Sequence, residues 1–153
     1  MLYAKEILIV ALSTLIPALE LRASIPLGVG LGVPWILVFF VAVLVNIILG
    51  PIVYILLDKF VCLLKKDSIF ERIYSKFVLR TQKKVSKYVE KYGEWAIAAF
   101  IAVPIPGSGS YSGALAAYLI GLSYKKFVIS NLIGVLIAGI IVTVVTLFFK
   151  SVF

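Results

Sequence analysis

Two polar clusters in an otherwise apolar sequence contain residue types that could bind a ligand. The first is Glu20 and Arg22, which lie two residues apart in a long apolar stretch. Charges inside a membrane are costly, so they usually face a cavity or a partner. A carboxyl group there could exchange a proton with an aqueous cavity, and a planar guanidinium suits an anion such as phosphate. The alternative is an Arg–Glu pair that only fixes a helical hairpin.

The second cluster is the segment PIPGSGSYSG at residues 104–113. Its glycines let the backbone approach a ligand closely, and its serines and tyrosine supply hydroxyl groups. Because the segment precedes a short apolar helix, its amides and the helix N-terminus predict an anion site. A tight turn with small residues for packing is the structural alternative. The candidate substrate-binding residues are therefore Glu20, Arg22, Pro26, Pro104, Pro106, Gly107, Ser108, Gly109, Ser110, Tyr111, Ser112 and Gly113.

The composition says which solvent these clusters face. Of 153 residues, 63% are apolar, against about 45–50% in a soluble domain. A soluble fold of this length has too little interior to hide that much apolar sequence, so we expect one membrane domain. Histidine is absent and Cys62 is the only cysteine, which argues against an enzyme, a metal site or a cofactor. The net charge of +8 fits cytoplasmic loops better than nucleic-acid binding.

The apolar segments differ in length, and this predicts the architecture. Residues 35–57 and 127–149 are 23 residues long and uncharged, which is enough to cross a bilayer. Residues 7–19 and 95–103 are too short to cross alone. The first short segment is followed by a Gly/Pro-rich stretch at 20–34, and the second by 104–113. Each half therefore predicts a short helix, a break, a second short helix or loop, and one full span.

Broken backbone at membrane depth is tolerated only where it is buried in protein or lines a wet cavity. Two breaks at matching places indicate a transporter built from internal repeats. The sequence GVPW from residue 32 and GLSY from residue 121 both predict a glycine turn and an interfacial aromatic residue before the long segment. The expected fold is an all-α integral membrane protein of two inverted repeats, 1–57 and 95–153. Each repeat would be a re-entrant helical hairpin plus one full transmembrane helix.

Residues 58–94 form a charged connector with ten basic and five acidic residues. A capping box at 68–71 and apolar residues at helical spacing predict an amphipathic helix that ends near Gly93. Anionic lipid binding and a plain connector that follows the positive-inside rule are both compatible with its basic side. The protein is thus expected in the cell membrane, multi-pass, with this connector cytoplasmic. The candidate lipid-contacting residues are Arg72, Lys76, Arg80, Lys84, Lys87 and Lys91.

Two asparagines lie within the long segments. Asn46 and Asn131 are expected to bond across helices or to cap a freed carbonyl. Gly50 and Pro51, in the first long segment, predict a kink. For both asparagines the structural interpretation is preferred to a role in binding.

The two broken segments also resemble a known family. The sequences ELRASIPLGVGLGVP at 20–34 and PIPGSGSYSGALAAYLIGL at 104–122, each followed by a span, resemble the small multidrug export proteins. These are related to the DedA / SNARE-associated membrane proteins. The resemblance implies an inverted pair of re-entrant hairpins and a transport function. It also implies kinship with proteins linked to translocation of polyprenyl-phosphate lipids and to lipid scrambling. Those relatives usually carry further charges in their hairpins, whereas residues 95–124 have none, so Glu20 would act alone.

Three functional hypotheses follow. The first is a transporter of a small amphipathic or anionic substrate, such as a polyprenyl phosphate or another lipid, with Glu20 supplying proton coupling. The second is an uncoupled lipid scramblase. The third is a membrane-organising protein that acts through the connector. The expected partners are membrane lipids and a small-molecule or lipid-phosphate substrate, without nucleic acid. A homodimer is compatible with the small number of helices.

Overall fold

The computed structural model describes residues 3–17, 19–64, 80–105 and 107–152, and for residues 64 and 80–90 it describes the backbone alone. All the regular structure in these ranges is helical. The helices are α1 (Ala4–Thr14), α2 (Glu20–Gly30), α3 (Trp35–Leu64), α5 (Arg80–Ala102), α6 (Ser110–Ile120) and α7 (Tyr124–Val152). This confirms the expected all-helical fold.

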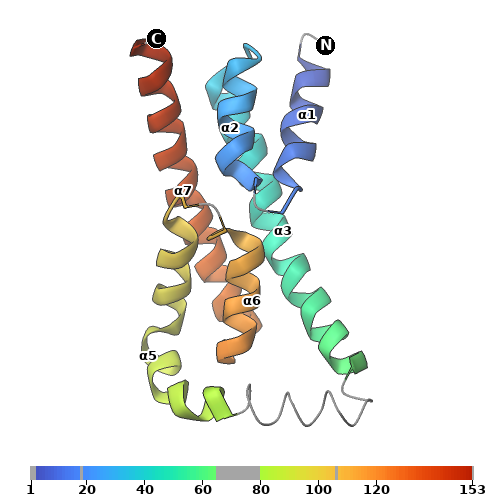
Figure 1. Ribbon diagram of the computed structural model, residues 1–153, viewed down its shortest axis with the longest axis vertical. Helices are drawn as coiled ribbons and strands as arrows, with labels where there is room; N and C mark the ends of the chain where they lie inside the picture. The colour runs from blue at the N-terminus through green and yellow to red at the C-terminus, as the bar shows by residue number, and fades with distance from the viewer. Residues whose placement is uncertain (1–2, 18, 65–79, 106, 153) are drawn as a thin grey trace.

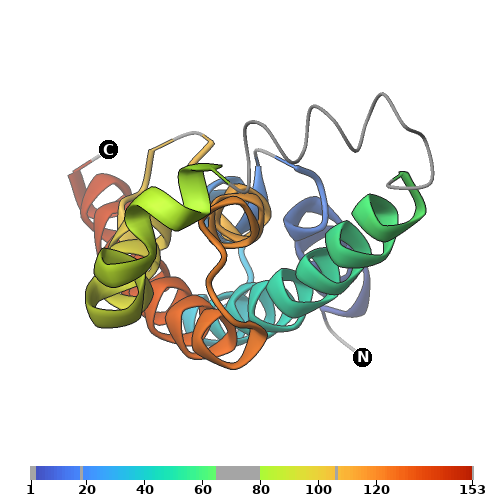
Figure 2. The ribbon, with the colours of Figure 1, turned by 90° about the horizontal axis from the view of Figure 1, so that it is seen from below.

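Two short hairpins occupy opposite ends of the molecule. Figure 1 shows α1 and α2 side by side in the upper half, and α6 beside the upper part of α5 in the lower half. The turns of the two hairpins meet near the middle, while α3 and α7 run along the full height. Both ribbon views place α6 between α5 and α3 (Figures 1 and 2). The breaks in the two hairpins are therefore neighbours in space, although they are far apart in sequence.

The two long helices are of membrane-spanning length and composition. Among the described residues, Trp35–Leu63 and Tyr124–Val152 are the two such helices, each with a mean hydropathy of 2.9. Both extend past their predicted limits, and α3 continues through Asp58 and Lys59 to Leu64. A helix of about 30 residues is about 45 Å long. That length matches a bilayer with its headgroup layers, where charged side chains can reach water.

The first break lies earlier than the sequence predicts. Residues 20–30 were expected to belong to a Gly/Pro-rich break, but they form the helix α2, and the described turn residues are 15–17 and 19. Pro26 lies inside α2. Gly28 serves packing, because a Cβ there would lie 2.7 Å from side-chain carbons of Val10 and Val38. Small residues that allow close helix packing in a membrane were thus mistaken for a break.

The helix α5 also differs from its prediction. Gly93 was expected to end one helix before another began, but α5 runs without interruption from Arg80 to Ala102. A glycine inside a helix costs only about 1 kcal/mol relative to alanine, and Gly93 is buried, so packing can offset that cost. The predicted capping box at 68–71 lies outside the described residues. In Figure 1 the first turns of α5 lie across the lower end of the molecule.

The two halves share one local structure after their second short helix. Gly32 and Gly121 both have a left-handed backbone, with φ of 83° and 78°. The next residue donates its N–H to the carbonyl five residues back, at 3.1 Å for Val33 and 2.9 Å for Leu122. This is the Schellman motif, for which glycine is favoured because it lacks a Cβ. The motif occurs twice, 89 residues apart, and turns the chain into each long helix.

A proline and an asparagine meet where α3 and α7 cross. Pro51 has no N–H, so the carbonyl of Ile47 lacks its helical donor. The side-chain Nδ2 of Asn131 on α7 lies 3.3 Å from that carbonyl oxygen. Gly50 makes room for Asn131, since a Cβ at Gly50 would lie 2.6 Å from the amide. Asn46 is buried nearby on α3, and neither polar atom of its side chain has a partner among the described residues.

This contact predicts a coupling between residues 51 and 131. We expect Asn131→Ala to lower the free energy of unfolding in the wild type, because the Ile47 carbonyl loses its donor. In a Pro51→Ala background the residue at 51 supplies an N–H, and the cost should fall by about 0.6–1.7 kcal/mol. Unfolding in mixed micelles, followed by circular dichroism for all four proteins of the cycle, measures the difference. Equal costs in both backgrounds would contradict the assignment.

Candidate functional site

The carboxylate of Glu20 caps a helix in the opposite hairpin. Glu20 begins α2 with a positive φ of 45°, and its side chain is buried. Its Oε2 accepts the backbone N–H of Ser110 at 3.0 Å, and its Oε1 accepts that of Tyr111 at 3.1 Å. The first N–H groups of a helix have no partner within the helix and carry a partial positive charge. The first hairpin therefore supplies the negative charge that α6 needs at its N-terminus.

The guanidinium of Arg22 lies at the other side of the same break, where α5 ends. Its Nη2 donates to the carbonyl of Val103 at 2.9 Å and lies 3.2 Å from that of Ile101. The carbonyl and the hydroxyl of Ser108 also accept from this nitrogen, so four acceptors share its two hydrogens. Helix C-terminal carbonyls carry a partial negative charge. Arg22 and Glu20 thus match both helix ends of the second hairpin, and they lie 3.7 Å apart, Nη1 to Oε2.

A reciprocal contact runs from the second hairpin to the first. The hydroxyl of Tyr111 donates to the carbonyl of Leu15 at 2.6 Å, and Leu15 directly follows the last residue of α1. Tyr111 and Arg22 are 89 residues apart, the same spacing as the two Schellman motifs. Each side chain reaches across to a carbonyl in the break of the other hairpin. Each break is therefore completed by its counterpart.

The chain around Ser108 and Gly109 allows the carboxylate to come this close. The Ser108 hydroxyl lies 2.6 Å from the carbonyl oxygen of Val103 and 2.9 Å from that of Ile105, which holds the turn. A Cβ added at Gly109 would overlap both carboxylate oxygens of Glu20. The sequence predicts that glycine here lets a ligand approach the backbone. The group that approaches in this structure is the side chain of Glu20.

The structure brings together half of the predicted binding residues. We call Glu20, Arg22, Ser108, Gly109, Ser110 and Tyr111 the hairpin junction. Pro26, Pro104 and Gly107 are exposed and make no part of it. Two predicted residues lie further along α6: Ser112 donates to the Gly109 carbonyl at 3.2 Å, and Gly113 packs against Ile101. Pro106 lies outside the described residues.

Most side chains of the connector's basic stripe lie outside the part of the chain that the structure describes. Arg72 and Lys76 lie in the undescribed range, and the side chains of Arg80, Lys84 and Lys87 are not described. Lys91 is exposed on α5, with its Nζ 5.1 Å from the ring centroid of Tyr92. The lipid-binding role of the stripe therefore stays a prediction.

Two polar contacts were not foreseen from the sequence. The Thr14 hydroxyl on α1 lies 2.7 Å from the carbonyl oxygen of Val10 and 2.8 Å from the hydroxyl oxygen of Ser24 on α2. The contact with Ser24 joins α1 to α2. Tyr54 on α3 donates to the carbonyl of Leu122 at 2.6 Å and stacks on Phe127, with ring centroids 5.1 Å apart. Hydroxyl groups inside apolar segments often bond between membrane helices. That rule would have signalled Thr14, Ser24 and Tyr54.

The hairpin junction has the chemistry of an anion site that its own chain fills. Two backbone N–H groups and a guanidinium surround one carboxylate. Two further donors, Arg22 Nε and the Ser110 hydroxyl, are buried without a partner among the described residues. No group of three or more metal-binding side chains occurs in the part of the chain that the structure describes. The site can therefore hold negative charge.

The paired side chains of Glu20 and Arg22 hydrogen-bond the first hairpin to the second, and two helices of membrane-spanning length flank them, which defines a small helical membrane protein. In this kind of protein the polar contacts between the hairpins lie where each hairpin turns. The chain belongs to the family described as "Putative small multi-drug export protein", whose sequence model matches residues 20–141. The match begins at Glu20 and includes the whole hairpin junction. Neither the curated proteins nor the solved structures gave a match to this chain.

Proposed function

We propose that this protein is a membrane transporter in which the hairpin junction is both substrate site and gate. The observation that carries the proposal is the Glu20 carboxylate seated on the N–H groups of Ser110 and Tyr111. The family description supports export as the direction of transport. The proposed substrate is a small amphipathic or anionic molecule, with a lipid phosphate as the first candidate.

The proposed arrangement in the membrane is two inverted repeats with re-entrant hairpins. The hairpins enter the molecule from opposite ends (Figure 1), and the Schellman motifs and the crossing contacts recur at a spacing of 89 residues. Helices α3 and α7 would be the full spans. The positive-inside rule places the basic connector in the cytoplasm. The breaks then lie at mid-membrane, where transporters built from repeats bind their substrates.

The proposed mechanism is a competition between Glu20 and the substrate anion. A protonated Glu20 loses its charge, and its attraction to the α6 N-terminus and to Arg22 weakens. When the carboxyl group leaves, the amides of Ser110 and Tyr111 and the guanidinium become available to an anion. Return of the deprotonated carboxylate expels that anion. Proton binding and anion binding are thereby linked, because one set of donors serves both.

The unpartnered donors favour phosphate over carboxylate as the substrate group. A carboxylate has two oxygens, and those of Glu20 already engage the two amides. Phosphate presents three acceptor oxygens. Arg22 Nε and the Ser110 hydroxyl belong to residues of the hairpin junction and are buried without a partner among the described residues. These two groups would bond the additional oxygen.

Flux in liposomes tests the proposal. A fluorescent short-chain prenyl phosphate serves as the probe, with and without a pH gradient. We expect Glu20→Gln to lower flux about tenfold, equal to about 1.4 kcal/mol, and to abolish its response to the gradient. The matched control is Glu6→Gln, which neutralises a carboxylate in the first turn of α1 and should change flux less than about twofold.

Other outcomes separate the alternatives. Flux of Glu20→Gln equal to wild type, with the same pH response, would overturn the gate. Flux of a labelled phospholipid that ignores the gradient and survives this change would favour uncoupled scrambling. A loss of function on neutralising the basic stripe alone, with the junction variants active, would favour a membrane-organising protein.

A further inference from the structure

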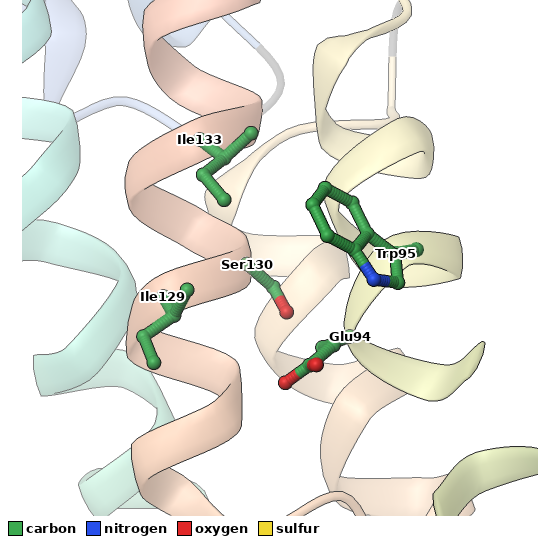
Figure 3. A pocket seen from close by; sticks show the side chains of 5 residues that line it. All are labelled: Glu94, Trp95, Ile129, Ser130 and Ile133. Atoms are coloured by element: carbon green, nitrogen blue, oxygen red, sulfur yellow. The ribbon is translucent and has the colours of Figure 1, made fainter. Parts of the chain in front are cut away.

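A cavity lies between α5 and α7 and shares no residue with the hairpin junction. It has a volume of about 90 Å³. Figure 3 shows its lining: the carboxylate of Glu94 and the indole of Trp95 both point from α5 toward α7. Across from them are Ile129, Ser130 and Ile133. Glu94 and Trp95 thus line one side of a cavity whose accessible surface is mostly apolar.

The polar groups at this cavity are suited to a cation. No side chain that the structure describes pairs with the Glu94 carboxylate by a hydrogen bond or an ion pair. Lys91, one turn earlier on α5, lies against the ring of Tyr92 instead. Ser130 donates its hydroxyl hydrogen to the Lys126 carbonyl at 2.8 Å, so the serine oxygen has only lone pairs left to offer. The indole face of Trp95 attracts cations through its quadrupole.

The size and the apolar wall narrow the class of cation. Pockets for whole drug-sized ligands measure about 300–1,000 Å³, so about 90 Å³ holds a head group and not a whole molecule. A primary ammonium carries three N–H donors, and the isoleucine side would leave some of them unpaired at a cost. A quaternary ammonium has no N–H donor, and its methyl groups pack against Ile129 and Ile133 without that cost.

We propose that this cavity binds the quaternary ammonium group of an amphipathic cation, while the rest of that molecule lies in the surrounding lipid. Glu94 supplies the opposing charge, Trp95 the cation–π contact, and Ile129 and Ile133 the apolar wall. The same chemistry occurs in a choline phospholipid and in a free cationic amphiphile. The site shares no residue with the hairpin junction, so its test does not depend on whether the proposed transport mechanism is correct.

The chain provides its own comparison site. Its two tryptophans are Trp35 and Trp95. Trp35 lines an apolar groove of about 210 Å³ between α3 and α7, together with Phe39, Ile140, Thr143, Val144 and Leu147. That groove has an indole and more space, but no carboxylate. A ligand that only follows apolar surface would therefore prefer Trp35, and a cation would prefer Trp95.

The test uses the two single-tryptophan proteins, Trp35→Phe and Trp95→Phe, in uncharged dodecyl maltoside micelles. Titration with hexyltrimethylammonium should give a saturable change in the fluorescence of Trp95 and only a linear drift for Trp35. The uncharged analogue 2,2-dimethyloctane should give no saturable change at either tryptophan. In the Trp35→Phe background, Glu94→Gln should weaken binding about tenfold, and Glu94→Asp less. Circular dichroism shows whether each variant keeps its helix content.

Vesicles then separate the two sources of the ammonium group. In phosphatidylglycerol vesicles, added hexyltrimethylammonium should produce the saturable change. In phosphatidylcholine vesicles, an occupying lipid should already produce it, and the added cation should do little more. A free amphiphile as the occupant would leave the titration the same in both. Equal responses of Trp35 and Trp95, or unchanged binding in a folded Glu94→Gln protein, would overturn the proposal.

Discussion

Replacing Gly109 with alanine is expected to break the hairpin junction. The added methyl group would occupy the space of both Glu20 carboxylate oxygens, so the carboxylate must leave the N–H groups of Ser110 and Tyr111. Hydrogen bonds to charged groups contribute about 1.5–3 kcal/mol each. Two are lost together and a charge is left in an apolar interior, so we expect a loss of about 3–5 kcal/mol of unfolding free energy. Denaturant unfolding in mixed micelles measures it.

A matched glycine provides the control for this prediction. Gly30 is helical, and a Cβ there would meet no heavy atom within 4 Å. Gly30→Ala should therefore be neutral or stabilise the protein by up to about 1 kcal/mol. The double variant Gly109→Ala with Glu20→Ala should cost less than the sum of the two single changes, because the clash needs both groups. Equal stability of Gly109→Ala and Gly30→Ala would show that the carboxylate does not occupy this position.

Replacing Arg22 with alanine should lower the free energy of unfolding by a similar amount, because it removes the cation and leaves the carboxylate in place. The carbonyl of Ser108 loses the guanidinium that donates to it and that of Val103 loses one of its donors, and Glu20 remains as a buried charge without the arginine. Removing one member of a buried ion pair typically costs about 3–5 kcal/mol. The loss should change little between low and high salt, since buried pairs are screened much less than exposed ones. The same unfolding measurement at two ionic strengths checks both statements.

Two further variants define what the guanidinium does. Arg22→Lys keeps the charge but cannot present a planar fork to several acceptors, so it should fall between wild type and alanine. Lys91→Ala removes an exposed cation on α5 and should change stability by less than about 0.5 kcal/mol. If Arg22→Ala were as stable as Lys91→Ala, Arg22 would not stabilise the hairpin junction.

Segment lengths and charge placement predict much of this fold. Two stretches of about 20 apolar residues became α3 and α7, and the short stretches became hairpins. The glycines at 32 and 121 were recognised as turns, and both adopt the left-handed backbone of a Schellman motif. These features are local, because each depends on residues within one or two helical turns. Such features can be predicted from one sequence, since the residues that determine them are neighbours along the chain.

The errors arose where tertiary packing decides. Gly28 looks like a helix breaker, yet it lies in α2 because Val10 and Val38 press against it. Gly93 looks like a helix end, yet it is buried inside α5. In both cases a neighbouring helix compensates the low helix propensity of glycine. Neighbours distant in sequence leave no periodic signal near the glycine itself.

The site was predicted by residue type but not by partner. Glu20 and the amides after Gly109 were both expected to matter, the amides as an anion site. Their contact spans 90 residues, and nothing in either segment indicates the other. Pairing a carboxylate with a helix N-terminus satisfies two costly groups at once in a medium without water. The sequence displays the two unsatisfied groups, and the structure shows that they satisfy each other.

The reciprocal contacts between the hairpins also constrain how the chain is made. The first hairpin leaves the ribosome long before Ser110 and Tyr111 exist, so the nascent Glu20 has no amides to bind. Arg22 is the partner that the first hairpin itself provides, and a charged pair without further hydrogen-bond partners is still costly in hydrocarbon. We therefore expect the first hairpin to stay beside the insertion machinery, or at the membrane surface, until the second hairpin is synthesised. A chain truncated before residue 110 would keep the Glu20–Arg22 pair but would lack the amides and carbonyls of the second hairpin that complete it.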